Sequence, residues 1–159
     1  MGKVLASFTN GYAGAVSRSI DDIIVSFPNA GNVSIPFGAP VFLQQSSGGG
    51  IPFASGLDMS TFLGFAARSA SKTPETYGEQ AGEYKPQEPM DVLTRGSIVV
   101  ETSGNPMPGG PVYIKLDTGK ITASAGTAGS TLELENCRFR GNKDGNNMAE
   151  VLVRSRNAG

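Results

Sequence analysis

The sequence contains no histidine and no tryptophan among its 159 residues, and it has one cysteine, Cys137. Without histidine, the commonest general base, the Ser-His-Asp and Cys-His arrangements and most transition-metal sites are excluded. A single cysteine rules out an intramolecular disulfide and a cysteine-rich zinc site. Because Cys137 lies in an alternating segment, we expect it to be a small buried hydrophobe. The sequence therefore predicts no cofactor and no metal site.

The sequence also lacks an excess of either charge and lacks long hydrophobic runs. The chain has 13 basic and 14 acidic residues, for a net charge of -1. Its densest basic group, between positions 138 and 156, is interleaved with acidic residues, which is typical of a solvated sheet face rather than a nucleic-acid footprint. No run of 18 apolar residues occurs, and the first seven residues are too short an apolar run for a signal peptide. We expect neither a nucleic-acid partner nor a membrane span.

Glycine and proline are abundant, with 22 and 10 copies, and they predict many turns. One stretch, residues 35–43 (IPFGAPVFL), combines a turn with the start of an apolar strand. Pro40 fits a strand start because it lacks an N–H, and Gly38 can adopt backbone angles closed to other residues. We expect Phe37, Val41 and Leu43 to share one core-facing side. The pattern recurs at 108–116 (PGGPVYIKL), which indicates a framework of strands that begin from kinked turns.

Alternating and β-branched runs predict about eight strands and no long helix. The predicted strands are residues 23–27, 41–43, 62–68, 91–101, 111–116, 121–123, 132–140 and 148–154, with one helical turn at 57–62. Gly64 suggests a close approach of another backbone, and Gly96 suggests a bulge. The fold class is therefore all-β: a small antiparallel β-sandwich or barrel with an extended N-terminal arm and long loops.

The polar and glycine-rich stretches divide the chain. We expect residues 1–20 to form an N-terminal arm and residues 21–159 to form a single β domain. Within that domain, residues 69–90 form a long polar loop or insertion, and loops of that length usually carry function or interactions. The glycine-rich stretch at 44–50 lacks the Lys-Ser/Thr ending of a phosphate-binding loop, so we interpret it as a linker.

Two weak motifs point to chemistry. Residues 117–119 (DTG) match the tripeptide of aspartic proteases, but Lys120 follows where a small residue is expected. A second group, with Asp144 and Glu150, resembles a fragment of a calcium loop, but Glu150 comes too early for the 12-residue motif. A turn is the favoured interpretation of both. We expect the protein not to be an enzyme.

Five segments, taken in order, carry a resemblance to a known family. They are residues 11–18 (GYAGAVSR), 35–41 (IPFGAPV), 65–68 (FAAR), 91–98 (DVLTRGSI) and 109–113 (GGPVY). Together the segments resemble the structural cement, or capsid decoration, proteins of tailed bacteriophages. One departure is Asn10, where the family pattern has proline before the Gly-Tyr pair.

The resemblance implies a non-enzymatic virion protein, made in the host bacterial cytoplasm and bound to the outer surface of the capsid. There it would bridge major capsid protein subunits and stabilise the head. It also implies self-association, with a trimer favoured over a dimer. We expect the arm and the turn at 36–40 to contact the capsid or sister subunits, through Phe8, Tyr12, Val16, Arg18, Pro36, Phe37 and Pro40.

An alternative is a carbohydrate- or ligand-binding β module of a virion. The β framework and three tyrosines, Tyr12, Tyr77 and Tyr84, favour it. The absence of tryptophan and of a clustered aromatic platform disfavours it. A glycan-binding screen separates this alternative from the capsid role.

Overall fold

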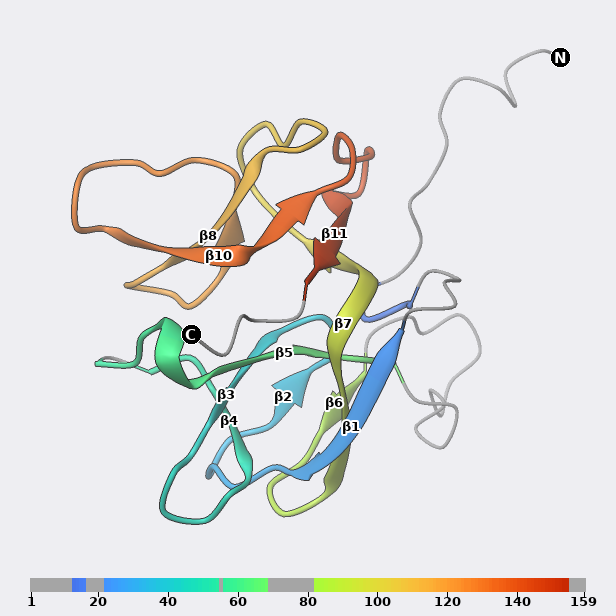
Figure 1. Cartoon of the computed structure of the whole chain (residues 1–159), viewed down its shortest axis with the longest axis vertical. Helices are drawn as coiled ribbons and strands as arrows, with labels where there is room; N and C mark the ends of the chain where they lie inside the picture. Colours follow the sequence, from blue (N-terminus) through green and yellow to red (C-terminus); the bar gives the residue numbers. More distant parts are fainter. Residues whose placement is uncertain (1–12, 17–21, 55, 69–81, 155–159) are drawn as a thin grey trace, which may run out of the picture.

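A computed structural model describes residues 13–16, 22–54, 56–68 and 82–154 of the chain (Figure 1). These residues form eleven strands and a single 3-10 turn, which confirms the all-β class. The strands are β1 (Ile23–Pro28), β2 (Ile35–Pro36), β3 (Pro40–Leu43), β4 (Gly50–Pro52), β5 (Phe62–Ala66), β6 (Glu83–Tyr84), β7 (Pro89–Glu101), β8 (Pro111–Lys115), β9 (Ile121–Thr122), β10 (Thr131–Phe139) and β11 (Met148–Val153). The turn, η2 (Met59–Thr61), is capped by the Asp58 carboxylate, which accepts from the Ser60 N–H at 2.9 Å.

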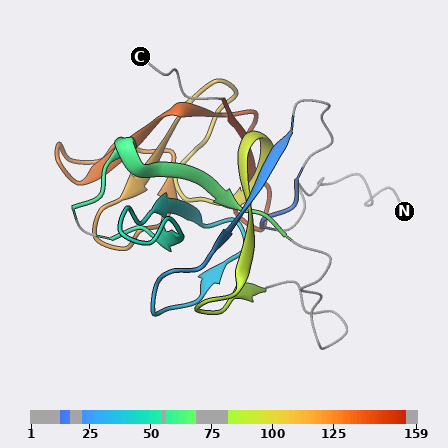
Figure 2. The same cartoon turned by 60° about the horizontal axis from the view of Figure 1, so that its bottom comes forward.

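Nine of these strands form one antiparallel sheet in the order β4-β3-β5-β7-β11-β10-β8-β9, with β1 added beside β7. The short strands β2 and β6 pair separately. The large sheet curls like half a barrel, and the curl brings η2 into contact with β10 (Figures 1 and 2). Within the described ranges, no helix has the length and hydrophobicity needed to cross a membrane.

Strand β7 connects the two halves of the sheet. Its first half pairs with β1 and β5, and its second half pairs with β11 from Gly96 onward. Gly96 has φ +129, and an added Cβ would lie 2.1 Å from a carboxylate oxygen of Asp22. Only glycine adopts this backbone conformation without strain, and the predicted irregularity lies at the point where the strand changes partners.

Both copies of the turn-and-strand pattern have the predicted form. Pro40 is the first residue of β3, and Pro111 is the first residue of β8. A glycine with positive φ precedes each strand: Gly38 at +84 and Gly109 at +79. A proline at the first position leaves no unpaired N–H in the ladder, so the two prolines and the two glycines together set where the strands begin.

The prediction that Phe37, Val41 and Leu43 share one core-facing side is right for Phe37 and Val41, which lie in the same core cluster, and wrong for Leu43. Val41 is fully buried in a small core cluster with Ile35 and Met90, while Phe42 is fully buried in the main core. Leu43 is only half-buried. The sheet curls around the main core, and β2 and β6 cover its other side, so both faces of β3 are packed. The half-exposed face that an alternating pattern implies does not exist here.

Two of the predicted segments include residues that the structure describes. Residues 13–16, assigned to the arm, are bonded to β7: Val99 accepts from the Gly14 N–H at 2.8 Å and donates to the Ala15 carbonyl at 2.9 Å. The remainder of the arm, residues 1–12 and 17–20, lies outside the described residues. In the predicted loop at 69–90, the described part contains β6 and the start of β7.

Candidate functional site

Three of the five segments that carry the family resemblance meet at one place, which we call the glycine junction and define by Gly14, Gly38 and residues 66–68. The Gly38 N–H donates to the Ala66 carbonyl at 2.7 Å, and the Arg68 N–H donates to the Gly14 carbonyl at 2.7 Å. An added Cβ at Gly38 would lie 3.0 Å from the Gly14 nitrogen, and both glycines have φ +84. The two backbones can approach this closely only because neither residue has a side chain.

Phe37 holds the junction to the small core cluster. Its ring is 5.2 Å from the Tyr84 ring in an edge-on arrangement, and the Arg68 guanidinium lies 5.1 Å from its centroid. The Phe37 N–H donates to the Gly82 carbonyl at 2.9 Å, and a Cβ at Gly82 would overlap the ring. Phe37 is only 5% exposed, so it fixes the turn at 36–40 from within the chain.

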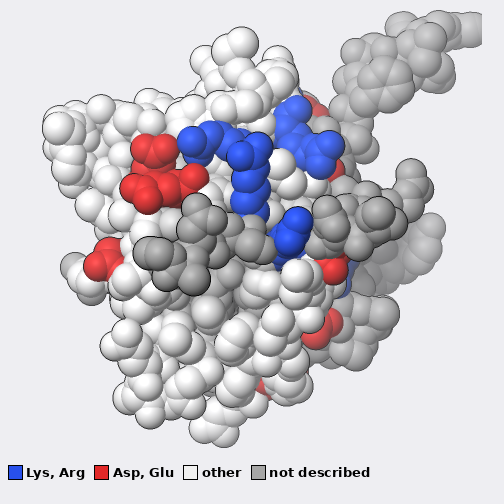
Figure 3. Space-filling model, in the orientation of Figure 1, with Lys and Arg blue, Asp and Glu red and all other residues white. Residues whose placement is uncertain are grey.

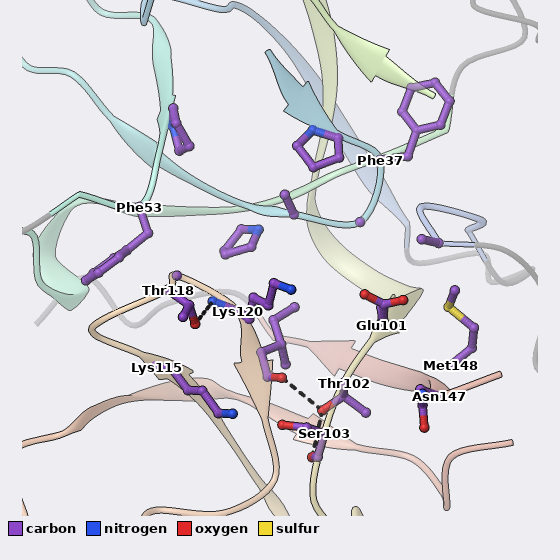
Figure 4. A pocket seen from close by; sticks show the side chains of 18 of the residues that line it. Phe37, Phe53, Glu101, Thr102, Ser103, Lys115, Thr118, Lys120, Asn147 and Met148 are labelled. Atoms are coloured by element: carbon purple, nitrogen blue, oxygen red, sulfur yellow. Dashed lines mark hydrogen bonds between the residues drawn. The ribbon is translucent and has the colours of Figure 1, made fainter. Parts of the chain in front are cut away.

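Beside the junction lies a groove of about 860 Å³, which we call the central groove. One wall is formed by Ala13, the turn at 36–40, and Pro52 with Phe53. The facing wall is formed by residues 101–103 and the β8–β9 hairpin (Figure 4). The walls touch where the hairpin turn meets Phe53, since an added Cβ on Gly119 would lie 3.6 Å from the Phe53 Cβ.

Three charged side chains line the central groove. Lys115 and Lys120 come from the hairpin side, with the Lys120 side chain directed toward Glu101, and Glu101 lies on the side of Asn147 and Met148 (Figure 4). The wall formed by the turn at 36–40, Pro52 and Phe53 is mainly proline, phenylalanine and glycine. Such a groove suits an extended polypeptide segment with apolar side chains and a carboxylate near the two lysines.

The structure brings some of the sequence-predicted contact residues together. Pro36, Phe37 and Pro40 line the central groove with Ala13. Pro36 is exposed and Pro40 is buried. Val16 is half-buried and forms an isolated bridge with Ile98 of β7. Phe8, Tyr12 and Arg18 lie outside the described residues.

Sequence reasoning missed the far wall of the groove. Lys115 and Lys120 flank a turn that the sequence did identify, and Gly119 there has φ +73. The local sequence does not predict that this turn lies opposite residues 36–40, because the curl of the whole sheet brings the two segments together. The turn itself is as predicted for residues 117–120: the Gly119 N–H donates to the Lys115 carbonyl at 2.8 Å, and Asp117 is exposed.

Tyr84 does not belong to a glycan-binding platform. It is 1% exposed, and its hydroxyl donates to the Ala67 carbonyl at 2.6 Å. Tyr12 and Tyr77 lie outside the described residues. The carbohydrate-binding alternative therefore loses one of its three supporting side chains to the core.

The calcium-loop fragment is a turn. The Asp144 carboxylate accepts from the backbone N–H groups of Asn146 at 2.8 Å and Met148 at 3.1 Å, and Asn147 adopts φ +64. Glu150 forms an ion pair with Arg140 at 3.6 Å. Within the described ranges, no group of three or more metal-ligating side chains is assembled.

The described part of the basic group, residues 138–154, has the mixed character expected of a solvated face, and Arg156 lies outside the described residues. Arg138 pairs with Glu133 at 3.8 Å, and Arg140 donates to the Ser97 hydroxyl at 2.8 Å. In Figure 3 basic and acidic side chains lie side by side on one half of the face, and the other half is mostly uncharged. Cys137 is fully buried in the main core, as predicted, and this burial raises the pKa of its thiol.

Comparisons with known proteins agree with the resemblance. Residues 3–154 match the family model described as "Structural cement protein (E217 gp24/Pam3 gp6)". A chain in the solved structure titled "The capsid of Myoviridae Phage XM1" is similar, with a TM-score of 0.70 and 24% identity, over 97% of this chain and 96% of that chain. This likeness shows a shared fold. A search of curated proteins finds no match.

Proposed function

The chain belongs to the phage structural cement protein family, and we propose that it binds the outer surface of the head, bridging neighbouring major capsid protein subunits. Its role as a capsid cement follows from the family, whose model spans residues 3–154. The outer-surface position, the identity of the bound capsid subunit and the contact residues are the proposed part.

One structural observation carries the proposed contact site: Ala13 lines the central groove together with the turn at 36–40, where it lies against Gly38. We therefore propose that residues before Ala13, which include Phe8 and Tyr12, bind the same partner as the turn at 36–40. Pro36 is the exposed contact in this proposal, whereas Phe37 and Pro40 hold the turn in place from inside.

The partner is an extended segment of the major capsid protein. Apolar side chains of the segment occupy the middle of the central groove, and a carboxylate lies near Lys115 and Lys120. Each such contact is modest, but a head displays many copies. Bridging sites on a shared shell raise the effective concentration of every further contact, so weak single contacts suffice to hold the shell together.

Cosedimentation with heads that lack the protein tests this proposal. The truncation should remove residues 2–12 and stop there, because residues 13–16 are bonded to β7. We expect the full chain to cosediment and the truncated chain to lose most of its binding while keeping its unfolding temperature. Undiminished binding by a folded truncated protein would refute the contact site.

We further propose that the copies self-associate with closed symmetry, the default for homo-oligomers, and that a trimer is favoured over a dimer. Light scattering of the purified protein measures the number of subunits. A monomer at all accessible concentrations contradicts self-association without affecting the capsid role.

A further inference from the structure

Strand β1 exposes an apolar run on both of its faces. Ile23, Ile24 and Val25 are consecutive, and their side chains are 45%, 47% and 39% exposed. Since consecutive residues of a strand point to opposite faces, these three residues leave apolar surface open on both faces of the first half of β1, whereas Phe27 further along packs partly against the small core cluster. Three adjacent β-branched aliphatic residues seldom remain open to water on both faces of a strand unless another surface covers them.

The outer edge of β1 is also open among the described residues. β1 pairs with β7 on one side, and no described strand pairs with its other side. It lies at the margin of the sheet beyond β7 (Figure 1). Natural edge strands are usually protected by charged residues, inward-pointing lysines or bulges. Residues 23–27 (IIVSF) carry no charge, so this edge has the features of a pairing strand.

We infer that β1 pairs antiparallel with β1 of a second copy, about a two-fold axis at Val25. Pro28 has no N–H and cannot donate to a ladder, which leaves residues 23–27 as the pairing stretch, with Val25 at its centre. In this register Val25 faces Val25 of the partner subunit, and Ile24 faces Ser26 of the partner subunit.

Charge favours the same arrangement. Antiparallel pairing about Val25 places Asp22 opposite Pro28 of the partner subunit, so no like charges meet. A parallel arrangement would place the two Asp22 carboxylates side by side, which is unfavourable. Residues 23–27 are therefore complementary to the same residues of a second copy in the antiparallel orientation. In the resulting pair, the large sheets of the two copies join into one continuous sheet through β1 of each copy.

This inference rests on the self-association proposed above and is independent of capsid binding. A two-fold contact joins copies in pairs; where copies have already closed into a trimer, the same contact joins neighbouring trimers. Its test uses purified full-length protein without capsids, so its failure leaves the cement role standing.

Disulfide trapping of Val25→Cys is the direct test. Opposite residues of an antiparallel pair have Cα atoms about 4.5–5.5 Å apart, within the range that a disulfide spans. We expect this variant to form a covalent dimer under mild oxidation. In Ser26→Cys, the matched control, the two equivalent Cα atoms lie roughly 8 Å apart, too far for a disulfide. Cys137 is buried, so the wild type should give no covalent dimer.

The inference predicts that Val25→Cys crosslinks at least tenfold faster than Ser26→Cys. Equal rates for the two variants would overturn it. A second variant, Val25→Lys, should retain the wild-type unfolding temperature because Val25 is exposed, and should weaken self-association in sedimentation velocity at least tenfold. Unchanged sedimentation of a folded Val25→Lys would also overturn the inference.

Discussion

The Tyr84 hydroxyl donates a 2.6 Å hydrogen bond to the Ala67 carbonyl, and both residues are buried. This bond ties the two-stranded sheet of β2 and β6 to the end of β5. Because Phe37 packs edge-on against Tyr84, the same bond supports the turn that borders the central groove. The turn at 36–40 is thus positioned by a buried contact.

Tyr84→Phe should destabilise the fold. The substitution keeps the ring and leaves the Ala67 carbonyl without its partner, which costs about 1–3 kcal/mol for a buried group. In a domain of this size we expect the unfolding temperature to fall by roughly 3–10 °C, measured by calorimetry. Tyr113→Phe is the control, because Tyr113 is half-buried on β8 and its hydroxyl donates no hydrogen bond to any described residue. An equal fall in unfolding temperature for Tyr84→Phe and Tyr113→Phe would contradict a stabilising role of the Tyr84 hydrogen bond.

Gly64→Ala should also be destabilising. An added Cβ would lie 2.0 Å from the Leu93 carbonyl oxygen, so β5 and β7 must separate. Overpacking of this kind costs about 1–3 kcal/mol or more, which urea unfolding detects. Gly141→Ala is the matched control, since no heavy atom lies within 4 Å of its added Cβ. The close approach at Gly64 is disproved if both variants unfold at the same urea concentration.

Cys137 should make stability fall at high pH. Burial raises the pKa of its thiol, and the nearby Arg138 charge opposes this only in part. Above the ordinary thiol pKa of about 8.5 the unfolded chain releases a proton that the native chain retains, so stability decreases as pH rises. At one pH unit above that thiol pKa, the free energy of unfolding should be lower by about 1.4 kcal/mol than at neutral pH. Cys137→Ala provides the comparison: the difference in stability between wild type and variant should shrink from pH 8 to pH 10. A difference that does not change with pH contradicts the prediction.

Pro36→Arg should weaken attachment to heads without unfolding the protein. Pro36 is exposed at the rim of the central groove, so an arginine there introduces bulk and charge where the proposed partner segment binds. Pro108→Arg, which changes the exposed proline of the second turn-and-strand copy, is the matched control. We expect at least tenfold weaker cosedimentation for the first variant alone. Wild-type binding by Pro36→Arg excludes Pro36 as a contact.

Local patterns in the sequence identified most of the fold. Strand starts at Pro40 and Pro111, the close approach at Gly64 and the irregularity at Gly96 all follow from residue types that permit few backbone conformations. The packing of both faces of β3 was not predictable, because Phe42 is buried by strands distant in sequence. Residues 82–90 are too polar for a strand signal, yet Tyr84 and Met90 are buried there.

The candidate site was only partly predictable. The family segments were recognised one by one, but the meeting of three of them at Gly14 and Gly38 depends on the curl of the sheet. Lys115 and Lys120 join the groove for the same reason. Pro36 and Phe37 were assigned one role, whereas exposure separates them: Pro36 faces solvent, and Phe37 is packed between Tyr84 and Arg68.

The central claim, that this chain cements a phage capsid, is tested most directly by the temperature at which heads release their DNA. Heads prepared without the protein are heated with a DNA-binding dye, with and without added purified protein. The account predicts that the added protein binds and raises the release temperature by several degrees, and that Pro36→Arg does so less than Pro108→Arg. Bound protein that leaves the release temperature unchanged, or a protein that fails to bind the heads, would contradict the claim.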